Sequence, residues 1–311
     1  PVYNGERYVD IALQSIRAQT FEEFELVISD NASTDRTEEI CQRYADTDSR
    51  IRYVRHDANG GAAGNFNHAL RLATAPYFRW ACDDDVLLPT NLERCVAVLD
   101  AEPETVLVAP RTTVIDAVGD TVADQSWLRR LDLRSPRPSR RLAAFLKAYR
   151  WLGCSSQLFG VARTDVLREV GGLGDYPSSD YVLLAEMALH GAVREVDEIL
   201  FKKRIHEGSS VEENDWDVDR MAEWLNPDNK GTIQWLEVRW LWEFIRAIHR
   251  SPVRGREKLA CYRQLMREYA TPHAKKIMKE VLLLTARTAS FGRLPMTQKT
   301  HGFNTMYRFK G

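Results

Sequence analysis

The sequence has few cysteines and no long hydrophobic run. Its five cysteines are scattered, without a C-x-x-C pair or a Cys/His cluster at zinc-binding spacing. This excludes a disulfide framework and a structural zinc site, and it is typical of a reducing compartment. A signal peptide and a stretch of about 18 apolar residues are also lacking, so we predict a cytoplasmic protein with no membrane span.

Charge is nearly balanced overall but unevenly distributed. The net charge is −1, whereas residues 251–311 hold 13 Lys and Arg against three Glu and no Asp. A basic end on an acidic body suggests an anionic partner for that end. We expect no nucleic-acid partner. Hydrophobic residues make up 44% of the chain, enough for a sizeable core.

Strand and helix patterns alternate through the first half of the chain. Such alternation predicts an α/β fold with a mostly parallel central sheet and helices on both faces. From about residue 215 to 290 the periodicity is helical. The opening Pro1–Gly5 resembles a turn that leaves a strand, so we expect a strand before it. The strands that we expect within the chain are 24–28, 51–54, 77–82, 105–108 and 155–161.

Acidic residues stand at the ends of two of these strands. Asp30 ends one, and Asp83, Asp84 and Asp85 follow another. In open α/β sheets, ligands bind beyond the carboxyl ends of the strands. Three adjacent carboxylates repel one another, which makes sense if a divalent cation lies among them. The alternatives are a solvated acidic turn for the triple and helix capping for the residues after Asp30.

Four motifs follow one another over about the first 85 residues. They are Pro1-x-Tyr3-Asn4-x-Glu6, Ser29-Asp30-Asn31-Ala32-Ser33-Thr34-Asp35, Asn59-x-Gly61 with Asn65 and Asn67, and Trp80-Ala81-Cys82-Asp83-Asp84-Asp85. In this order they resemble family 2 glycosyltransferases, which are nucleotide-sugar-dependent enzymes with a Rossmann-like GT-A fold. Asn31-Ala32 stands where many members carry Asp-Gly. The resemblance continues more loosely to about residue 210.

The resemblance implies a donor site. It implies a nucleoside-diphosphate sugar, with a UDP-sugar the first expectation, and Mn²⁺ or Mg²⁺ on the diphosphate. Such an ion offsets charge on the leaving group. The candidate donor-binding residues are Pro1, Tyr3, Glu6, Asp30, Asn59, Asn65, Asp83, Asp84 and Arg204. The candidate metal ligands are Asp83, Asp85 and His206, with Asp84 as a further candidate.

An inverting transfer also needs a base for the acceptor hydroxyl. The family presents it as the Asp of a Glu-Asp pair that opens a helix after a Gly-Gly-Phe-like turn. Gly171-Gly172-Leu173 precedes Ser179-Asp180 here, so Asp180 matches the base, with Ser179 in place of the Glu. A helix cap is the alternative for Asp180, and Glu186 is the second candidate base.

Two further groups of residues are weaker candidates. Similar enzymes use a His or Arg at the position of Arg204-x-His206 to close over the diphosphate or complete the metal shell, and imidazole suits Mn²⁺. A structural histidine is the alternative. Aromatic rings that could stack on an acceptor sugar, or simply belong to the core, are Trp127, Tyr149 and Trp151.

We therefore expect a catalytic domain over residues 1–212 and a C-terminal helical region over 213–311. The donor part spans about 1–110 and the acceptor part about 111–212. The expected activity is inverting transfer of a sugar to a hydroxyl in bacterial glycan, glycolipid or polysaccharide synthesis, with small hydroxylated molecules as further acceptors. One alternative is a nucleotidyltransferase, but the Gly-rich loop that such an enzyme needs is absent from this sequence. The other is a non-catalytic nucleotide-sugar-binding module. A dinucleotide-binding enzyme is disfavoured because G-x-G-x-x-G is absent.

The C-terminal region has an apolar stripe with basic residues beside or opposite it. The stripe consists of Leu259, Tyr262, Leu265 or Met266, and Tyr269, and the basic residues are Arg256, Lys258, Arg263 and Arg267. In one interpretation the stripe packs on the catalytic domain or on a second subunit, as in a homodimer. In the other, the basic residues approach anionic lipid or a lipid-linked phosphate acceptor, giving peripheral contact with the inner membrane surface.

Overall fold

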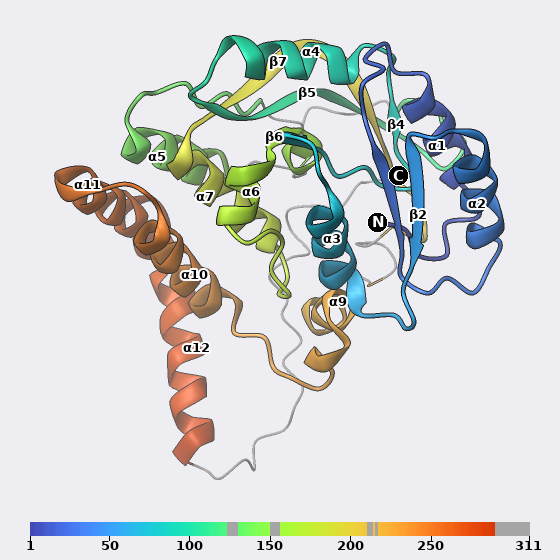
Figure 1. Cartoon of the computed structure of the whole chain (residues 1–311). Helices are drawn as coiled ribbons and strands as arrows, with labels where there is room; N and C mark the ends of the chain where they lie inside the picture. Colours follow the sequence, from blue (N-terminus) through green and yellow to red (C-terminus); the bar gives the residue numbers. More distant parts are fainter. Residues whose placement is uncertain (123–129, 150–155, 210–213, 215–216, 290–311) are drawn as a thin grey trace.

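The structure is a computed structural model, and it describes residues 1–122, 130–149, 156–209, 214 and 217–289. An α/β body is joined to a helical C-terminal region (Figure 1). The first half contains α1 (Val9–Arg17), β1 (Leu26–Asp30), α2 (Thr37–Thr47), β2 (Ile51–Arg55), α3 (Gly61–Leu72), β3 (Tyr77–Phe78), β4 (Val86–Leu87), α4 (Asn91–Ala101) and β5 (Thr105–Ile115).

The remaining elements are mostly helical. The second half of the body contains α5 (Pro138–Tyr149), the 3₁₀ turn η1 (Ser156–Phe159), β6 (Val161–Arg163), α6 (Thr164–Glu169), α7 (Ser179–His190) and β7 (Ala192–Arg204). The C-terminal region contains α9 (Val218–Leu225), η2 (Pro227–Asn229), α10 (Leu236–Arg250), α11 (Gly255–Leu265), the π-helical turn η3 (Met266–Ala270) and α12 (Thr271–Ala289).

The strands form a parallel pair and a mixed sheet. β1 pairs with β2 in parallel, and Val2 extends this pair through a parallel bridge to Asp30. The second sheet has the order β3-β6-β5-β7-β4, in which only β5 and β7 are parallel. The predicted α/β class with helices around a sheet is confirmed. The sheet is mixed rather than mostly parallel, because β6 and β4 run antiparallel to their neighbours.

The segment expected as a strand over 77–82 leaves the sheet after Phe78. Trp80 turns into the core, where it is 2% exposed and its indole N–H donates to the carbonyl of Phe66 at 2.9 Å. The chain then re-enters the sheet only at β4. This early departure carries the residues 82–85 out of the sheet and toward the first loop of the chain, where Asp83 lies against Gly5.

Helix α7 is the central helix of the body. Its residues from Val182 to Leu189 are all buried, as expected of a helix that is hydrophobic on every side. It contacts β5 and β7 together with α5 and α10. The same core continues into the C-terminal region through Trp240, Phe244 and Tyr269. The C-terminal helices therefore share a hydrophobic core with the body.

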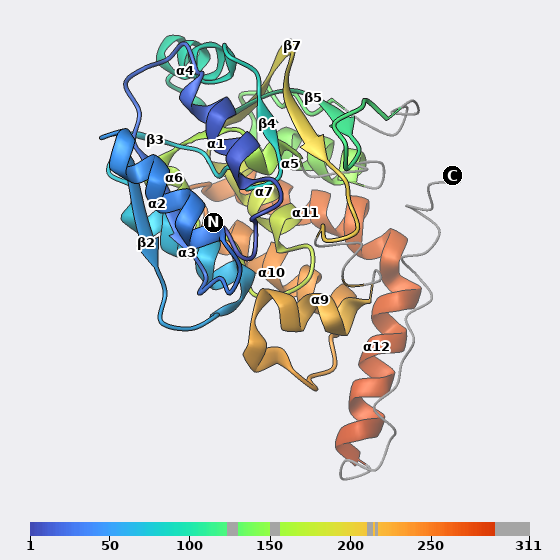
Figure 2. The ribbon, with the colours of Figure 1, turned by 90° about the vertical axis from the view of Figure 1, so that its right-hand side faces the viewer.

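The C-terminal region is helical as predicted, and α12 projects from the body in both views (Figures 1 and 2). Among the described helices, none is both long and apolar enough to cross a membrane. The predicted apolar stripe does not form one face. Leu265 and Tyr269 are buried, whereas Leu259 and Met266 are exposed. The buried face of α11 is centred on Cys261 and Leu265, nearly opposite Leu259.

Candidate active site

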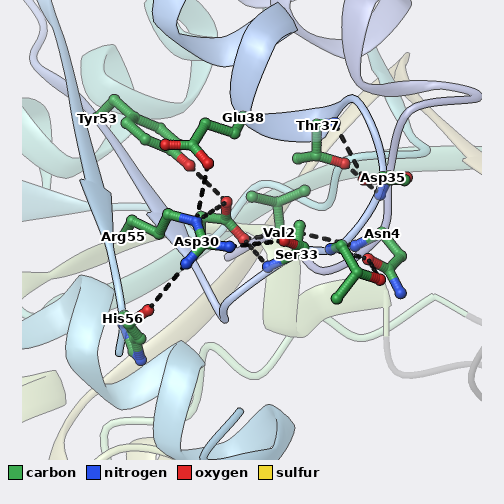
Figure 3. A network of polar contacts seen from close by, with 12 residues as sticks. Val2, Asn4, Asp30, Ser33, Asp35, Thr37, Glu38, Tyr53, Arg55 and His56 are labelled. Carbon is green, nitrogen blue, oxygen red and sulfur yellow. Dashed lines mark hydrogen bonds and ion pairs between the residues drawn. The ribbon is translucent and has the colours of Figure 1, made fainter. Parts of the chain in front are cut away.

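The carboxylate of Asp30 organises the loop after β1 (Figure 3). It is fully buried, and one oxygen accepts hydrogen bonds from the amide and hydroxyl of Ser33, at 2.9 and 2.6 Å. The other accepts the Tyr53 hydroxyl at 2.5 Å and lies 3.9 Å from Arg55 Nε. Burial and this hydrogen bond raise the pKa of Tyr53. A contact between Asp30 and a nucleotide base remains a prediction, and it requires this fully buried carboxylate to become accessible.

The first residues of the chain are fixed to this loop. The Val2 amide donates to the Ser29 carbonyl at 2.9 Å, and the Val2 carbonyl accepts the Asn31 amide at 3.0 Å. Asn4 has a left-handed backbone, with φ of 51°, and its side-chain oxygen accepts the Thr34 amide at 2.8 Å. The segment that begins at Pro1 thus lies beside the end of β1, where a ligand of the sheet would bind.

Two other predicted pocket residues differ in their freedom. Glu6 is tied to the start of α2, because its carboxylate accepts the amide and the Nε of Arg36 at 3.1 and 3.3 Å. Its own amide donates to Asp35 at 3.0 Å. Tyr3 is 45% exposed. Both side chains are exposed, that of Glu6 to 41%, but Glu6 is held by its bonds to Arg36.

Asparagines join the loop after β1 to the start of α3. Asn31 donates to the side-chain oxygen of Asn59 at 2.8 Å, and that oxygen also accepts the Gly61 amide at 2.9 Å. Asn65 is 3% exposed and donates to the Val2 carbonyl at 3.2 Å. Its Oδ1 is buried without a hydrogen-bond partner among the described residues. Buried polar atoms rarely stay unpaired, so this oxygen is a candidate ligand contact.

Two of the three adjacent carboxylates lie in unfavourable surroundings for their charge. Asp83 lies so close to Gly5 that a Cβ on that glycine would collide with its carboxylate. Burial, with the charge of Asp84 adding to it, raises the pKa of Asp83 to about 7. Asp85 is 3% exposed and accepts the Arg204 amide at 2.8 Å, and burial again raises its pKa, with Asp84 as the next cause. A cation at this place would offset the accumulated negative charge.

The grouping of possible metal ligands differs from the expected set. One ligand atom each of Cys82, Asp84 and Asp85 lies within 4.8 Å of the other two. His206 Nε2 lies 3.1 Å from Asp84 Oδ2, although the two residues are 122 positions apart. Asp84 is therefore the common member, because it lies in one group with Asp85 and also contacts His206, whereas Asp83 lies against the glycine of the first loop. Sequence reasoning had placed Asp83 rather than Asp84 in the main ligand set.

Arg204 is buried and holds this site together. Its Nε donates to the Asp84 carbonyl at 2.8 Å and one terminal nitrogen to the Asp116 carbonyl at 3.0 Å. The guanidinium lies over the ring of Tyr8, 4.6 Å from its centroid, and the His206 ring is 4.7 Å from the same ring. Sequence reasoning missed Tyr8, whose only signal is an aromatic residue directly before the first helix. A contact between Arg204 and a diphosphate stays a prediction.

Asp180 lies in the first turn of α7 and is half-buried. The helix starts after Ser178, which has a left-handed backbone with φ of 58°. The second candidate base, Glu186, is wrong on this geometry. It is 2% exposed, and its two oxygens accept Arg250 Nε at 3.0 Å and a terminal Arg250 nitrogen at 2.5 Å. A buried carboxylate held on both oxygens cannot receive a proton from an acceptor.

The aromatic acceptor candidates have no described environment. Trp127 and Trp151 lie outside the described residues. Tyr149 ends α5, but its side chain lies outside the description. Stacking of these rings on an acceptor sugar therefore stays a prediction.

Residues 1–170, more than half of the chain, match the sequence profile described as Glycosyl transferase family 2. The chain belongs to this family. It is 34% identical to the putative glycosyltransferase EpsE of Bacillus subtilis over 119 residues, 38% of this chain and 43% of EpsE. It is 36% identical to an uncharacterized glycosyltransferase of Rickettsia felis over 102 residues, 32% of this chain and 16% of that protein. The chain thus spans less than half the length of these curated relatives.

Solved structures with low sequence identity share the fold. TarS of S. aureus, crystallised in complex with UDP, has a TM-score of 0.58 at 18% identity, over 88% of this chain and 71% of that one. The mannosyltransferase PcManGT from Pyrobaculum calidifontis, in complex with GDP-Man and Mn²⁺, has a TM-score of 0.52 at 18% identity, over 95% and 75%. These likenesses confirm the predicted GT-A fold for this family 2 chain.

Proposed function

We propose that this chain is an inverting glycosyltransferase that moves a sugar from a nucleoside-diphosphate sugar to an acceptor hydroxyl, with a divalent cation and Asp180 as general base. The observation that carries the proposal is that Asp84 lies in one group with Asp85 and also contacts His206, next to the residue that touches the first loop of the chain. The acidic segment 82–85 and the segment that carries His206 are far apart in sequence, and each follows a strand of the sheet. In open α/β sheets, ligands bind beyond the carboxyl ends of the strands. Related folds crystallised with UDP and with GDP-Man and Mn²⁺ support this class of donor.

The residues present fit a divalent cation. Carboxylates suit Mg²⁺ and Mn²⁺, and imidazole suits Mn²⁺. Asp84, Asp85 and His206 would hold the ion, which would act as a Lewis acid on the leaving diphosphate. Cys82 is the least suited member of the group, because burial and the neighbouring carboxylates raise the pKa of its thiol well above the usual value and keep it protonated.

The donor pocket would lie between the first loop and α3. The buried, unpaired Oδ1 of Asn65 would accept a hydrogen bond from a base N–H or a ribose hydroxyl if donor binding opened this position, because its amide nitrogen already holds the Val2 carbonyl. Tyr3 offers an exposed aromatic ring for stacking. We expect a UDP-sugar. Asp83, at the glycine of the first loop, would approach the ribose or the donor sugar.

Asp180 would take the proton of the acceptor hydroxyl while that oxygen attacks the anomeric carbon. The bond to the nucleoside diphosphate breaks on the opposite side, so the configuration inverts. A carboxylate in the first turn of α7 is stabilised in its charged form by the helix dipole. The charged form is the one that a general base needs.

The decisive experiment measures nucleoside diphosphate release and sugar transfer by the purified chain. UDP-, GDP- and dTDP-sugars are tested with and without Mn²⁺. Asp84→Asn should abolish metal-dependent turnover, and Asp180→Asn should lower kcat by ~10²–10⁴-fold with unchanged donor affinity. Asp165→Asn, in the first turn of α6, is the matched control and should stay active. Pyrophosphate release would indicate a nucleotidyltransferase instead, and donor binding without any turnover a non-catalytic module.

The proposed acceptor is a hydroxyl of a bacterial glycan, glycolipid or polysaccharide, reached by a cytoplasmic enzyme at the inner membrane surface. The support comes from α12, where Met278 and Leu282 are each 62% exposed and Lys275 and Lys279 are exposed on the same helix. Co-sedimentation with anionic vesicles, but not with neutral ones, would support this contact, and Leu282→Ser should weaken it. Light scattering tests the alternative, a homodimer through the same face.

A further inference from the structure

The loop that leads into Asp180 contains a strained residue. Ser178 has φ of 58°, a left-handed conformation that is rare for a residue with a side chain. Such a conformation is unfavourable by itself and persists only where surrounding contacts enforce it. Within the loop, the Ser179 hydroxyl donates to the Gly174 carbonyl at 2.8 Å, and the Ser179 amide to the Tyr176 carbonyl at 3.1 Å. These local bonds hold the residues before Ser178, but the peptide that precedes it is held from elsewhere.

That peptide is held by the C-terminal region. The indole N–H of Trp240, on α10, donates to the Pro177 carbonyl at 2.9 Å in a buried position. Trp240 is 6% exposed. A buried tryptophan usually finds a partner for its N–H, and this partner is the carbonyl directly before the strained residue. The bond therefore fixes the orientation of the peptide from which α7 starts.

The two residues before Pro177 are held by the same region. Asn229 donates to the Asp175 carbonyl at 2.7 Å, and the guanidinium of Arg239 lies over the Tyr176 ring, 4.7 Å from its centroid. Three consecutive loop residues thus contact α10 or the turn before it. On the other side, Asn67 of α3 donates to the Leu173 carbonyl at 2.7 Å, which ties the loop to the helix that also carries Asn65.

We propose that Trp240 is a positioning residue that holds the Pro177–Ser178 peptide and thereby aims Asp180 at the acceptor hydroxyl. The C-terminal region then acts on catalysis through the start of α7. The inference rests on the proposed role of Asp180 as base. A catalytic group displaced by about 1 Å can lose ~10²-fold in rate, so one hydrogen bond at this position has a measurable effect on turnover.

The test compares two substitutions on one helix. Trp240→Phe removes the indole N–H and keeps an aromatic side chain in the core. It should lower kcat by about 10- to 100-fold with unchanged donor affinity. It should also speed hydrogen exchange of the amides in residues 174–181. Trp242→Phe is the matched control, because Trp242 is 56% exposed, and it should change neither quantity. Asn229→Ala removes the bond to the Asp175 carbonyl and should also lower kcat. This variant tests the proposal if Trp240→Phe does not fold.

A second variant pair separates this inference from the proposed function. If Trp240 acts through Asp180, Trp240→Phe should have almost no further effect on kcat in the Asp180→Asn background. An undiminished effect there overturns the inference, as does normal kcat in both Trp240→Phe and Asn229→Ala. Normal turnover in Asp180→Asn alone overturns the base assignment and, with it, this role of Trp240. Asp180→Asn therefore reports on the proposed function independently of the Trp240 variants.

Discussion

The ion pair between Glu186 and Arg250 permits a prediction with a definite asymmetry. Glu186 is 2% exposed on α7, whereas the side chain of Arg250 on α10 is 41% exposed. The carboxylate raises the pKa of Arg250 through the hydrogen bonds between them. Arg250→Met removes both bonds, whereas Glu186→Gln keeps one acceptor oxygen, and the two substitutions leave different groups behind. Arg250→Met leaves a buried carboxylate, and Glu186→Gln leaves a guanidinium that can reach water.

The two costs follow from these environments. Removing one partner of a buried pair costs ~3–5 kcal/mol, and the partly open position of Arg250 puts Arg250→Met near the lower end. Glu186→Gln keeps one acceptor oxygen for the guanidinium and should cost about 1 kcal/mol, as for an ordinary hydrogen bond. We therefore expect Arg250→Met to be less stable than Glu186→Gln by about 2 kcal/mol. The double variant should lose less than the sum of both.

Urea unfolding of the three variants and the unchanged chain measures these free energies, provided that the slopes agree. Arg246→Met, four residues earlier on α10 and 49% exposed, is the control for loss of an arginine from this helix. Equal costs for Arg250→Met and Glu186→Gln, or a larger cost for Glu186→Gln, would refute the reasoning from burial. Additive costs in the double variant would show that the pair does not act as a unit.

Three further outcomes are expected. Gly61→Ala should destabilise by ~1–2 kcal/mol from its left-handed backbone alone, with a collision against the Leu225 carbonyl adding to this, as urea unfolding will show. Tyr53→Phe should cost ~1–3 kcal/mol, because it removes a donor from the buried carboxylate at the end of β1. Burial lowers the pKa values of His56 and His68, so their contribution to stability is lost as the pH falls below about 6.5. The stability of His68→Asn should therefore fall less between about pH 8 and pH 5.5 than that of the unchanged chain.

The sequence predicted those features that depend on neighbouring residues. β1 and β2 were expected because short apolar runs end there at polar residues. The same pattern predicted an acidic residue at the end of 26–30 and acidic residues within 82–85. The position of Asp180 at the start of a helix was expected from the resemblance to the family, in which a Gly-Gly turn precedes the base. Local pattern is sufficient for such features, since strand ends and helix starts are set by residues within a few positions.

Contacts between distant segments were not predictable in this way. Nothing near Asp30 in sequence indicates Tyr53 as its partner, and nothing near Glu186 indicates Arg250. Strand direction in the second sheet also depends on how the chain returns, so the antiparallel β6 could not be distinguished from a parallel strand. The choice of Asp84 over Asp83 beside His206 depends on how the chain turns after Trp80, which the run of three identical residues does not reveal.

The division of the chain at residue 212 separates the recognised motifs from the rest, but the packing crosses it. The buried face of α10 belongs to the same core as α7, and Trp240 meets the loop that begins α7. The Leu225 carbonyl, at the end of α9, lies so close to Gly61 that a side chain on Gly61 would collide with it. C-terminal helices therefore contact both halves of the proposed site. They contact the start of α3 on the donor side and the start of α7 on the acceptor side. A region without recognisable motifs can in this way set the geometry of a reaction whose chemical groups all lie outside it.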